Sequence, residues 1–123
     1  GVIADCGFTS AADIIKYTLE NKIHLKWELH KKAIDKLVYN RIGFKTDAYS
    51  TLEAMQTNQL PILFVHGDAD SLIPLDMTMQ NYQACTAPKK ILIVDGAEHG
   101  LSYLQNTELY ESMVKEFLET LLR

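Results

Sequence analysis

The chain is poor in the residues that define several common protein classes. Its 123 residues include two cysteines, three prolines, six glycines and one tryptophan. Two cysteines are too few for a disulfide framework, so we expect Cys6 and Cys85 to be small buried side chains. Scarce proline and glycine exclude a collagen-like or low-complexity chain. No apolar run reaches the roughly 18 residues that span a membrane as a helix, and no signal peptide is recognisable.

A strong excess of one charge is absent as well. Twelve basic residues face 16 acidic ones, for a net charge of −4, which argues against a general nucleic-acid-binding protein. The charge is unevenly spread, since residues 22–45 hold seven basic and two acidic residues, a net +5. The simpler interpretation is a solvated helix face, and the alternative is a basic surface that attracts anionic substrates or membranes.

The apolar residues, 47% of the chain, fall in distinct runs. Residues 2–4, 62–65 and 91–94 are short and continuously apolar, which is typical of strands buried on both faces. Helices are predicted over residues 11–19, within 22–45 ending near Gly43, and over 47–55, 76–85 and 107–122. Strands that alternate with helices indicate one α/β domain with a parallel sheet.

Two of the apolar runs end in polar loops. One leads into HGDADSLIP from His66 to Pro74, and the other into GAEHG from Gly96 to Gly100. In open parallel sheets, active-site residues lie at the carboxyl ends of the strands. Asp70 and His99 both follow such ends. Neutral imidazole can accept a proton from an alcohol nucleophile near pH 7, while a carboxylate on its other nitrogen orients the ring.

These loops resemble those of the α/β-hydrolase superfamily, and the likeness covers essentially the whole chain. In that family the acid follows the seventh strand, often as H-G-x-x-D-x-x-x-P, and the histidine follows the eighth. The resemblance implies Asp70 as the acid and His99 as the base of a Ser–His–Asp triad. Asp68 is the rival acid, and His66 is expected to help hold the acid loop.

The segment ADCGFTS from Ala4 to Ser10 resembles the sixth-strand exit of the prolyl-oligopeptidase-like and serine-aminopeptidase-like branch. In that branch the following helices form a small lid, which implies a lid over about residues 11–45. Three side chains are candidates for lining an apolar substrate pocket, namely Phe8, Ile73 and Leu101.

The serine that such a pair would serve is missing. No G-x-S-x-G motif occurs, and no serine of the chain lies in an equivalent elbow. Cys6 follows a different strand and Cys85 falls late in a helix, so neither is expected to replace it. Because the chain does not begin with Met, we expect residues 1–123 to be the C-terminal part of an α/β-hydrolase domain whose N-terminal half carries the nucleophile.

The resemblance therefore implies a carboxylesterase-like serine hydrolase that cleaves a small-molecule ester, or an amide, through an acyl-enzyme. The isolated chain is expected to be inactive. No cofactor is expected, and no metal either, because His-x-x-x-His and Cys-x-x-Cys pairs are absent. We expect a cytoplasmic location unless a signal or membrane anchor lies upstream of Gly1.

A second hypothesis belongs to a different class of function. The chain is then a non-catalytic binding or assembly module on the same scaffold. Its first strand would expose an edge, and such an edge pairs readily with another chain, including a second copy. This hypothesis predicts a homo-oligomer rather than a hydrolase.

Overall fold

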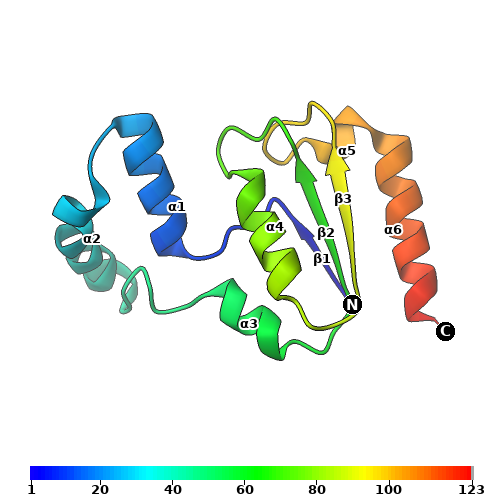
Figure 1. The fold of residues 1–123 in the computed structure, drawn as a ribbon, viewed down its shortest axis with the longest axis horizontal. Coiled ribbons are helices and arrows are strands. Elements are labelled where there is room, and N and C mark those ends of the chain that lie inside the picture. Colours follow the sequence, from blue (N-terminus) through cyan, green and yellow to red (C-terminus); the bar gives the residue numbers. More distant parts are fainter. Residues whose placement is uncertain (123) are drawn as a thin grey trace.

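A three-stranded parallel sheet forms the centre of the computed structural model, which describes residues 1–122. Its strands lie in the order β1 (Val2–Asp5), β2 (Ile62–Gly67) and β3 (Lys89–Val94). Ile62 at the start of β2 lies opposite Val2 of β1 and Lys89 of β3, so the strands begin nearly level. The carboxyl ends of all three therefore lie at one edge of the sheet. The predicted α/β class and parallel sheet are confirmed (Figure 1).

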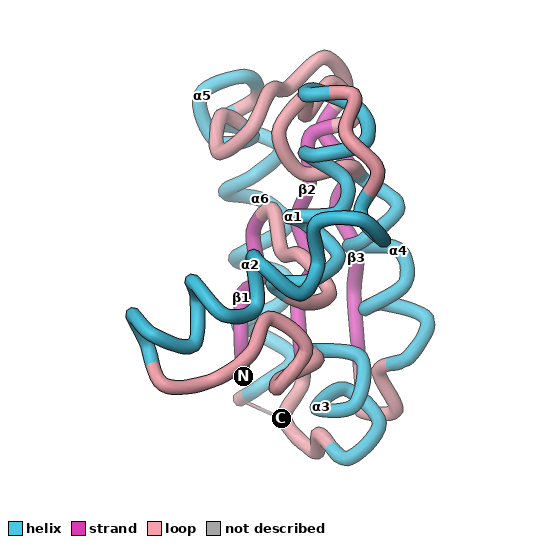
Figure 2. The backbone as a smooth tube through the Cα atoms, turned by 90° about the vertical axis from the view of Figure 1, so that its left-hand side faces the viewer, coloured by secondary structure: helices cyan, strands magenta, loops and turns pink. Residues whose placement is uncertain are grey.

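Helices cover both faces of this sheet. In chain order they are α1 (Ala11–Thr18), its π-helical continuation η1 (Leu19–Ile23), α2 (Trp27–Ile42), α3 (Thr51–Thr57), α4 (Leu75–Ala84), α5 (Ser102–Gln105) and α6 (Thr107–Leu121). Figure 1 shows α4 and α6 on opposite sides of the strands, with α1 and α2 standing away from the sheet. Figure 2 views the molecule from the side of α1 and α2, and the strands run behind these two helices. Within residues 1–122, none of the helices is both long and apolar enough to span a bilayer.

The central strand is buried on both faces, which explains its continuous apolar sequence. Leu63 and Val65 point toward α6, where they pack with Leu92, Val94, Ala97 and Phe117. Ile62 and Phe64 point the other way and form a second cluster with Cys85 and Ala87. Because successive strand residues face opposite sides, a two-sided core requires apolar side chains at consecutive positions.

Polar side chains fix where the helices begin. The Oγ of Ser10 accepts a hydrogen bond from the backbone N–H of Asp13 at 3.0 Å and so caps α1. Ser50 caps α3 in the same manner through the N–H of Leu52 at 3.2 Å. The prediction of a helix over residues 47–55 was therefore wrong at its start, because the cap lies three residues later. The four-residue α5 was not predicted, since it is too short to show a helical period.

Glycine and proline account for two further boundaries. Helix α2 ends at Gly43, whose φ of 83° lies in the left-handed region that glycine adopts without strain. Pro74 precedes α4 in an extended conformation, as expected for a proline at a helix start.

Asp35 holds α2 to the segment that returns toward the sheet. Its carboxylate accepts hydrogen bonds from Lys31 at 2.7 Å and from the hydroxyl and N–H of Thr46 at 2.6 and 3.2 Å. Led by the bond from Lys31, these lower the pKa of Asp35 to about 2. The carbonyl of Thr46 also accepts the N–H of Ala12 in α1 at 3.1 Å. Helices α1 and α2 are thereby joined into one unit.

The two chain segments that connect the α1–α2 unit to the sheet lie side by side. Ser10, which leads into α1, forms an isolated antiparallel bridge with Ser50, which leads back to α3. The N–H of Thr51 donates to the carbonyl of Thr9 at 2.8 Å beside it. Both chain connections between the α1–α2 unit and the sheet therefore pass through the same point.

Phe117 provides a test of the core between the sheet and α6. The ring is 2% exposed, whereas the adjacent Leu118 on the same helix is 47% exposed. We expect Phe117→Ala to lower the free energy of unfolding by about 3–5 kcal/mol, because it leaves a cavity against β2 and β3. Leu118→Ala is the matched control, with a change of about 0.5 kcal/mol or less in urea unfolding. Equal effects of the two substitutions would contradict this packing.

Candidate active site

Asp70 lies in the turn after β2 and is held there by the backbone. Its side chain is fully buried, and Oδ1 accepts hydrogen bonds from the N–H groups of Leu72 and Ile73 at 2.9 and 2.8 Å. Burial by itself would raise the pKa of Asp70. Hydrogen bonds from Ile73, His99 and Leu72 outweigh burial, so the pKa lies below its ordinary value. Asp70 is therefore an ionised carboxylate with a fixed orientation.

His99 follows β3 and faces this carboxylate. Its Nδ1 lies 2.8 Å from Oδ2 of Asp70. The carboxylate favours the tautomer in which Nδ1–H donates, which leaves Nε2 as the basic nitrogen of the neutral ring. The His99 side chain is 37% exposed, so the ring connects a buried anion to an open surface. This pair can accept a proton at Nε2 and stabilise the resulting imidazolium.

The rival acid, Asp68, has a different partner. Its Oδ1 accepts the backbone N–H of Gly96 at 2.7 Å and so links the acid loop to the histidine loop. His66 is completely buried beneath Asp70. Its Nδ1 lies 2.7 Å from the Thr78 hydroxyl, and its Nε2 lies 3.0 Å from the Ile73 carbonyl and 3.2 Å from Oδ2 of Asp70. His66 thus joins the acid loop to α4, in line with the sequence-based expectation.

The two loops touch where Gly67 meets Ala97. The Ala97 carbonyl accepts the N–H of Ala69 at 3.2 Å. A Cβ atom on Gly67 would lie 2.1 Å from that carbonyl oxygen, far inside van der Waals contact. A side chain at position 67 would therefore push the acid loop away from the histidine loop.

Cys6 joins this pair from the third strand end. It follows β1 with a φ of 54°, and its Sγ accepts the N–H of Gly100 at 3.3 Å and donates to Asp5 Oδ1 at 3.1 Å. Ligand atoms of Cys6, Asp70 and His99 all lie within 4.8 Å of one another. Burial raises the pKa of the Cys6 thiol to about 12. From the sequence we expect Cys6 to be buried at the end of a different strand, away from Asp70 and His99. Because parallel strands end at one edge of a sheet, the structure brings Cys6 beside them.

No hydroxyl group within residues 1–122 is hydrogen-bonded to Nε2 of His99. Ser10 serves as the cap of α1, and Ser71 donates to Glu98 at 3.0 Å. Ser102 is completely buried, and its Oγ has no hydrogen-bond partner among the described residues. The described part of the chain therefore pairs a buried carboxylate with a histidine whose other ring nitrogen has no hydroxyl group bonded to it.

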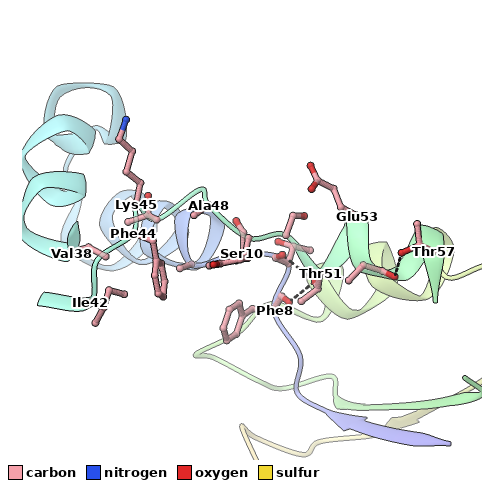
Figure 3. A pocket seen from close by; sticks show the side chains of 16 residues that line it. Phe8, Ser10, Val38, Ile42, Phe44, Lys45, Ala48, Thr51, Glu53 and Thr57 are labelled. Atoms are coloured by element: carbon pink, nitrogen blue, oxygen red, sulfur yellow. Dashed lines mark hydrogen bonds between the residues drawn. The ribbon is translucent and has the colours of Figure 1, made fainter. Parts of the chain in front are cut away.

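Two hollows adjoin at Phe8. The first, about 520 Å³, is lined by Cys6, Phe8, Ile73 and His99 among others. The second, about 730 Å³, lies between α2, α3 and the loop after β1, and it shares Phe8 and Thr51 with the first. Figure 3 shows Phe8, Ile42 and Phe44 projecting to one side of the connecting chain, while Lys45 and Glu53 point to the other. Two hollows that share Phe8 and Thr51 thus lie between His99 and α2.

The three residues expected to line a substrate pocket lie in different places. Phe8 and Ile73 border the hollow beside His99. Leu101 lies just before α5, is 44% exposed, and borders neither of the two adjoining hollows.

No family model matches the chain. It is 32% identical over 120 residues to the uncharacterized protein YqkD of Bacillus subtilis, a match that spans 97% of this chain and 39% of YqkD. The fold resembles the Pyrococcus furiosus esterase PF2001 with a TM-score of 0.63 at 14% identity, over 98% of this chain and 44% of that one.

A second solved structure gives the same result. MGS-MChE2, an α/β-hydrolase enzyme from a sediment metagenome of the Mar Chica lagoon, matches with a TM-score of 0.59 at 11% identity. The match covers 96% of this chain and 49% of MGS-MChE2. The chain therefore has an α/β-hydrolase fold and spans less than half the length of each of these three proteins.

The contact between the two loops can be tested at Gly67. We expect Gly67→Ala to separate Asp70 from His99 and to lower the free energy of unfolding by about 1–3 kcal/mol through overpacking. Gly7→Ala is the matched control, because its new Cβ would approach only Asn81 Nδ2, at 4.0 Å. Urea unfolding measures both variants, and a Gly67→Ala variant as stable as Gly7→Ala would contradict the close approach.

Proposed function

We propose that the chain supplies the acid and base of a serine hydrolase, with Asp70 as the acid and His99 as the base. The observation that carries the proposal is the 2.8 Å contact between Nδ1 of His99 and Oδ2 of Asp70, at the ends of adjacent parallel strands. The nucleophilic serine and the oxyanion-binding N–H groups belong to another part of the protein. The match to 39% of YqkD and 44% of an esterase supports a larger hydrolase domain.

In the proposed reaction, Nε2 of His99 takes the proton of the serine as its oxygen attacks the carbonyl carbon. Asp70 stabilises the imidazolium that forms. The imidazolium then protonates the leaving alkoxide, so the bond to the alcohol breaks and an acyl-enzyme remains. His99 then takes a proton from a water molecule as it attacks the acyl carbon, the ester bond to the serine breaks, and the imidazolium returns the proton to the serine oxygen as the acid leaves.

An ester is the substrate class that the comparisons favour. Two proteins whose solved structures have this fold are called esterases, one from Pyrococcus furiosus and one from Thermogutta terrifontis. The adjoining hollows give an apolar group of the substrate a path from His99 past Phe8 to the space beneath Phe44. In this proposal the α1–α2 unit, within residues 11–45, acts as a lid over that space. Amide hydrolysis by the same residues is the alternative.

An assembly role has one specific observation in its favour. Within residues 1–122 the outer edge of β1 has no partner strand, and its Val2 and Ile3 are 39% and 42% exposed. In the hydrolase proposal, the rest of the same sheet continues at this edge. In the alternative, a second chain pairs there.

Substitution of the dyad in the complete natural protein tests the hydrolase proposal. We expect His99→Ala and Asp70→Asn each to reduce kcat for a p-nitrophenyl ester by about 10³-fold or more, because the serine loses its base or the base loses its orientation. His30→Gln is the control, since His30 is bonded to the Lys26 carbonyl on the exposed side of α2, and it should keep full activity. Near-normal turnover by His99→Ala would overturn the proposal.

The chain on its own provides the complementary test. Residues 1–123 should neither hydrolyse the ester nor react with a serine-directed fluorophosphonate probe, because their hydroxyl groups are not paired with His99. Gel fluorescence and mass spectrometry measure labelling, with the complete protein as the positive control. Labelling of a serine within residues 1–123 would show that the nucleophile lies in this part.

Size-exclusion chromatography of the complete protein tests the assembly alternative.

A further inference from the structure

We propose that Cys6, Asp70 and His99 form a binding site for one thiophilic divalent cation of the zinc type. The three residues lie at the ends of three different parallel strands, and one ligand atom of each lies within 4.8 Å of the other two. One atom is a sulfur, one a ring nitrogen and one a carboxylate oxygen. These are the three donor types from which proteins build zinc sites.

The three donors have to change their spacing before they can share one cation. Zn²⁺ binds sulfur at about 2.3 Å and imidazole nitrogen or carboxylate oxygen at about 2.0–2.2 Å, so tetrahedral donors lie roughly 3.3–3.8 Å apart. The present limit of 4.8 Å exceeds this range by about 1 Å. The contact of 2.8 Å between Nδ1 of His99 and Oδ2 of Asp70 is shorter than this spacing, so the His99 ring has to turn away from the carboxylate. Leu72 and Ile73 hold that carboxylate in place, so the sulfur of Cys6 has to move toward it.

The surroundings allow a cation to reach the site. Cys6 and His99 both border the hollow of about 520 Å³, which is open enough to leave room for water as a further ligand. Binding converts the Cys6 thiol to a thiolate, and the released proton passes to solvent. A soft thiolate favours Zn²⁺ over Mg²⁺ or Ca²⁺, which prefer sites made entirely of oxygen.

A cation at this position would switch off the proposed hydrolase, a consequence that rests on the proposed function. If the cation takes Nδ1 of His99, it replaces the hydrogen bond to Asp70. If it takes Nε2, it occupies the nitrogen that accepts the serine proton. Either arrangement removes the base, and chelation of the cation restores it. Zinc would then act as a reversible inhibitor.

The absence of short metal-binding motifs had led us to expect no metal site. Such motifs report ligands that lie close in sequence, for example on one helix or in one loop. Cys6, Asp70 and His99 are far apart in the chain and meet only because the three strands are parallel and nearly level. The expectation considered Asp70 and His99 as ligands but did not include Cys6.

Direct binding to the complete natural protein tests the site without reference to activity. With Co²⁺ as the spectroscopic probe, we expect a thiolate-to-cobalt charge-transfer band in the near ultraviolet, displaced by one equivalent of Zn²⁺. Cys6→Ser should abolish the band and weaken Zn²⁺ binding by ~10-fold or more in competition with a chromophoric chelator. Cys85→Ser is the matched control, because Cys85 lies in the core on the α4 side of the sheet, and it should keep both signals.

Two results would overturn the site. The first is the absence of a charge-transfer band in the wild-type protein at saturating Co²⁺, which needs no variant and so does not depend on whether Cys6→Ser folds. The second is a band that survives Cys6→Ser or disappears in Cys85→Ser. Circular dichroism of each variant checks that it is folded.

Measuring ester hydrolysis with and without Zn²⁺ distinguishes the metal site from the proposed hydrolase. Ester hydrolysis by the wild-type protein, first measured in EDTA, should fall at least ~10-fold with excess Zn²⁺ and return when EDTA is restored. Zn²⁺ binding without any hydrolysis in EDTA would contradict the hydrolase and leave the site standing. Hydrolysis in EDTA that is insensitive to Zn²⁺, without a cobalt band, would contradict the site and leave the hydrolase standing.

Discussion

The parallel, nearly level register of the three strands is the constraint on which the rest of the structure depends. It brings residues from distant parts of the chain, Cys6, Asp70 and His99, to one edge of the sheet. The register is itself fixed by burial, because β2 places apolar side chains on both faces and a shift by one residue would exchange the two clusters. The packing of the core therefore fixes the relative positions of the three side chains.

Burying Asp70 as an anion is costly unless polar groups surround it. Here the cost is offset by two backbone N–H groups on one oxygen and by His99 on the other, with His66 beneath. The same network explains why a histidine, His66, lies in the otherwise apolar β2. It ties the acid loop to Thr78 on α4, and Thr78 donates to the carbonyl of Gly7 beyond β1. The acid is thus positioned by contacts from all parts of the sheet edge.

Much of this could be predicted from sequence, for physical reasons that particular residues illustrate. The apolar runs of β2 and β3 predicted strands because two-sided burial leaves no polar alternation, and Gly43 marked the end of α2. The meeting of an acid with His99 followed from strand ends in a parallel sheet, and the choice of Asp70 over Asp68 came from the resemblance to the α/β-hydrolase motif. The start of α3 at Thr51 was missed because several serines, threonines and aspartates nearby can cap a helix. The place of Cys6 was missed because its neighbours come from other strands.

The crossing at Ser10 and Ser50 has a mechanical consequence. The α1–α2 unit is held together internally by Asp35 and Thr46, yet both of its connections to the sheet pass through this one bridge. A unit joined to the sheet through one bridge can turn about that bridge as a whole, without rearranging the core of the sheet. Phe8, two residues from the bridge, borders both hollows. Rotation of the α1–α2 unit would therefore change the shape of the two hollows at Phe8, while the sheet and its strand ends keep their positions.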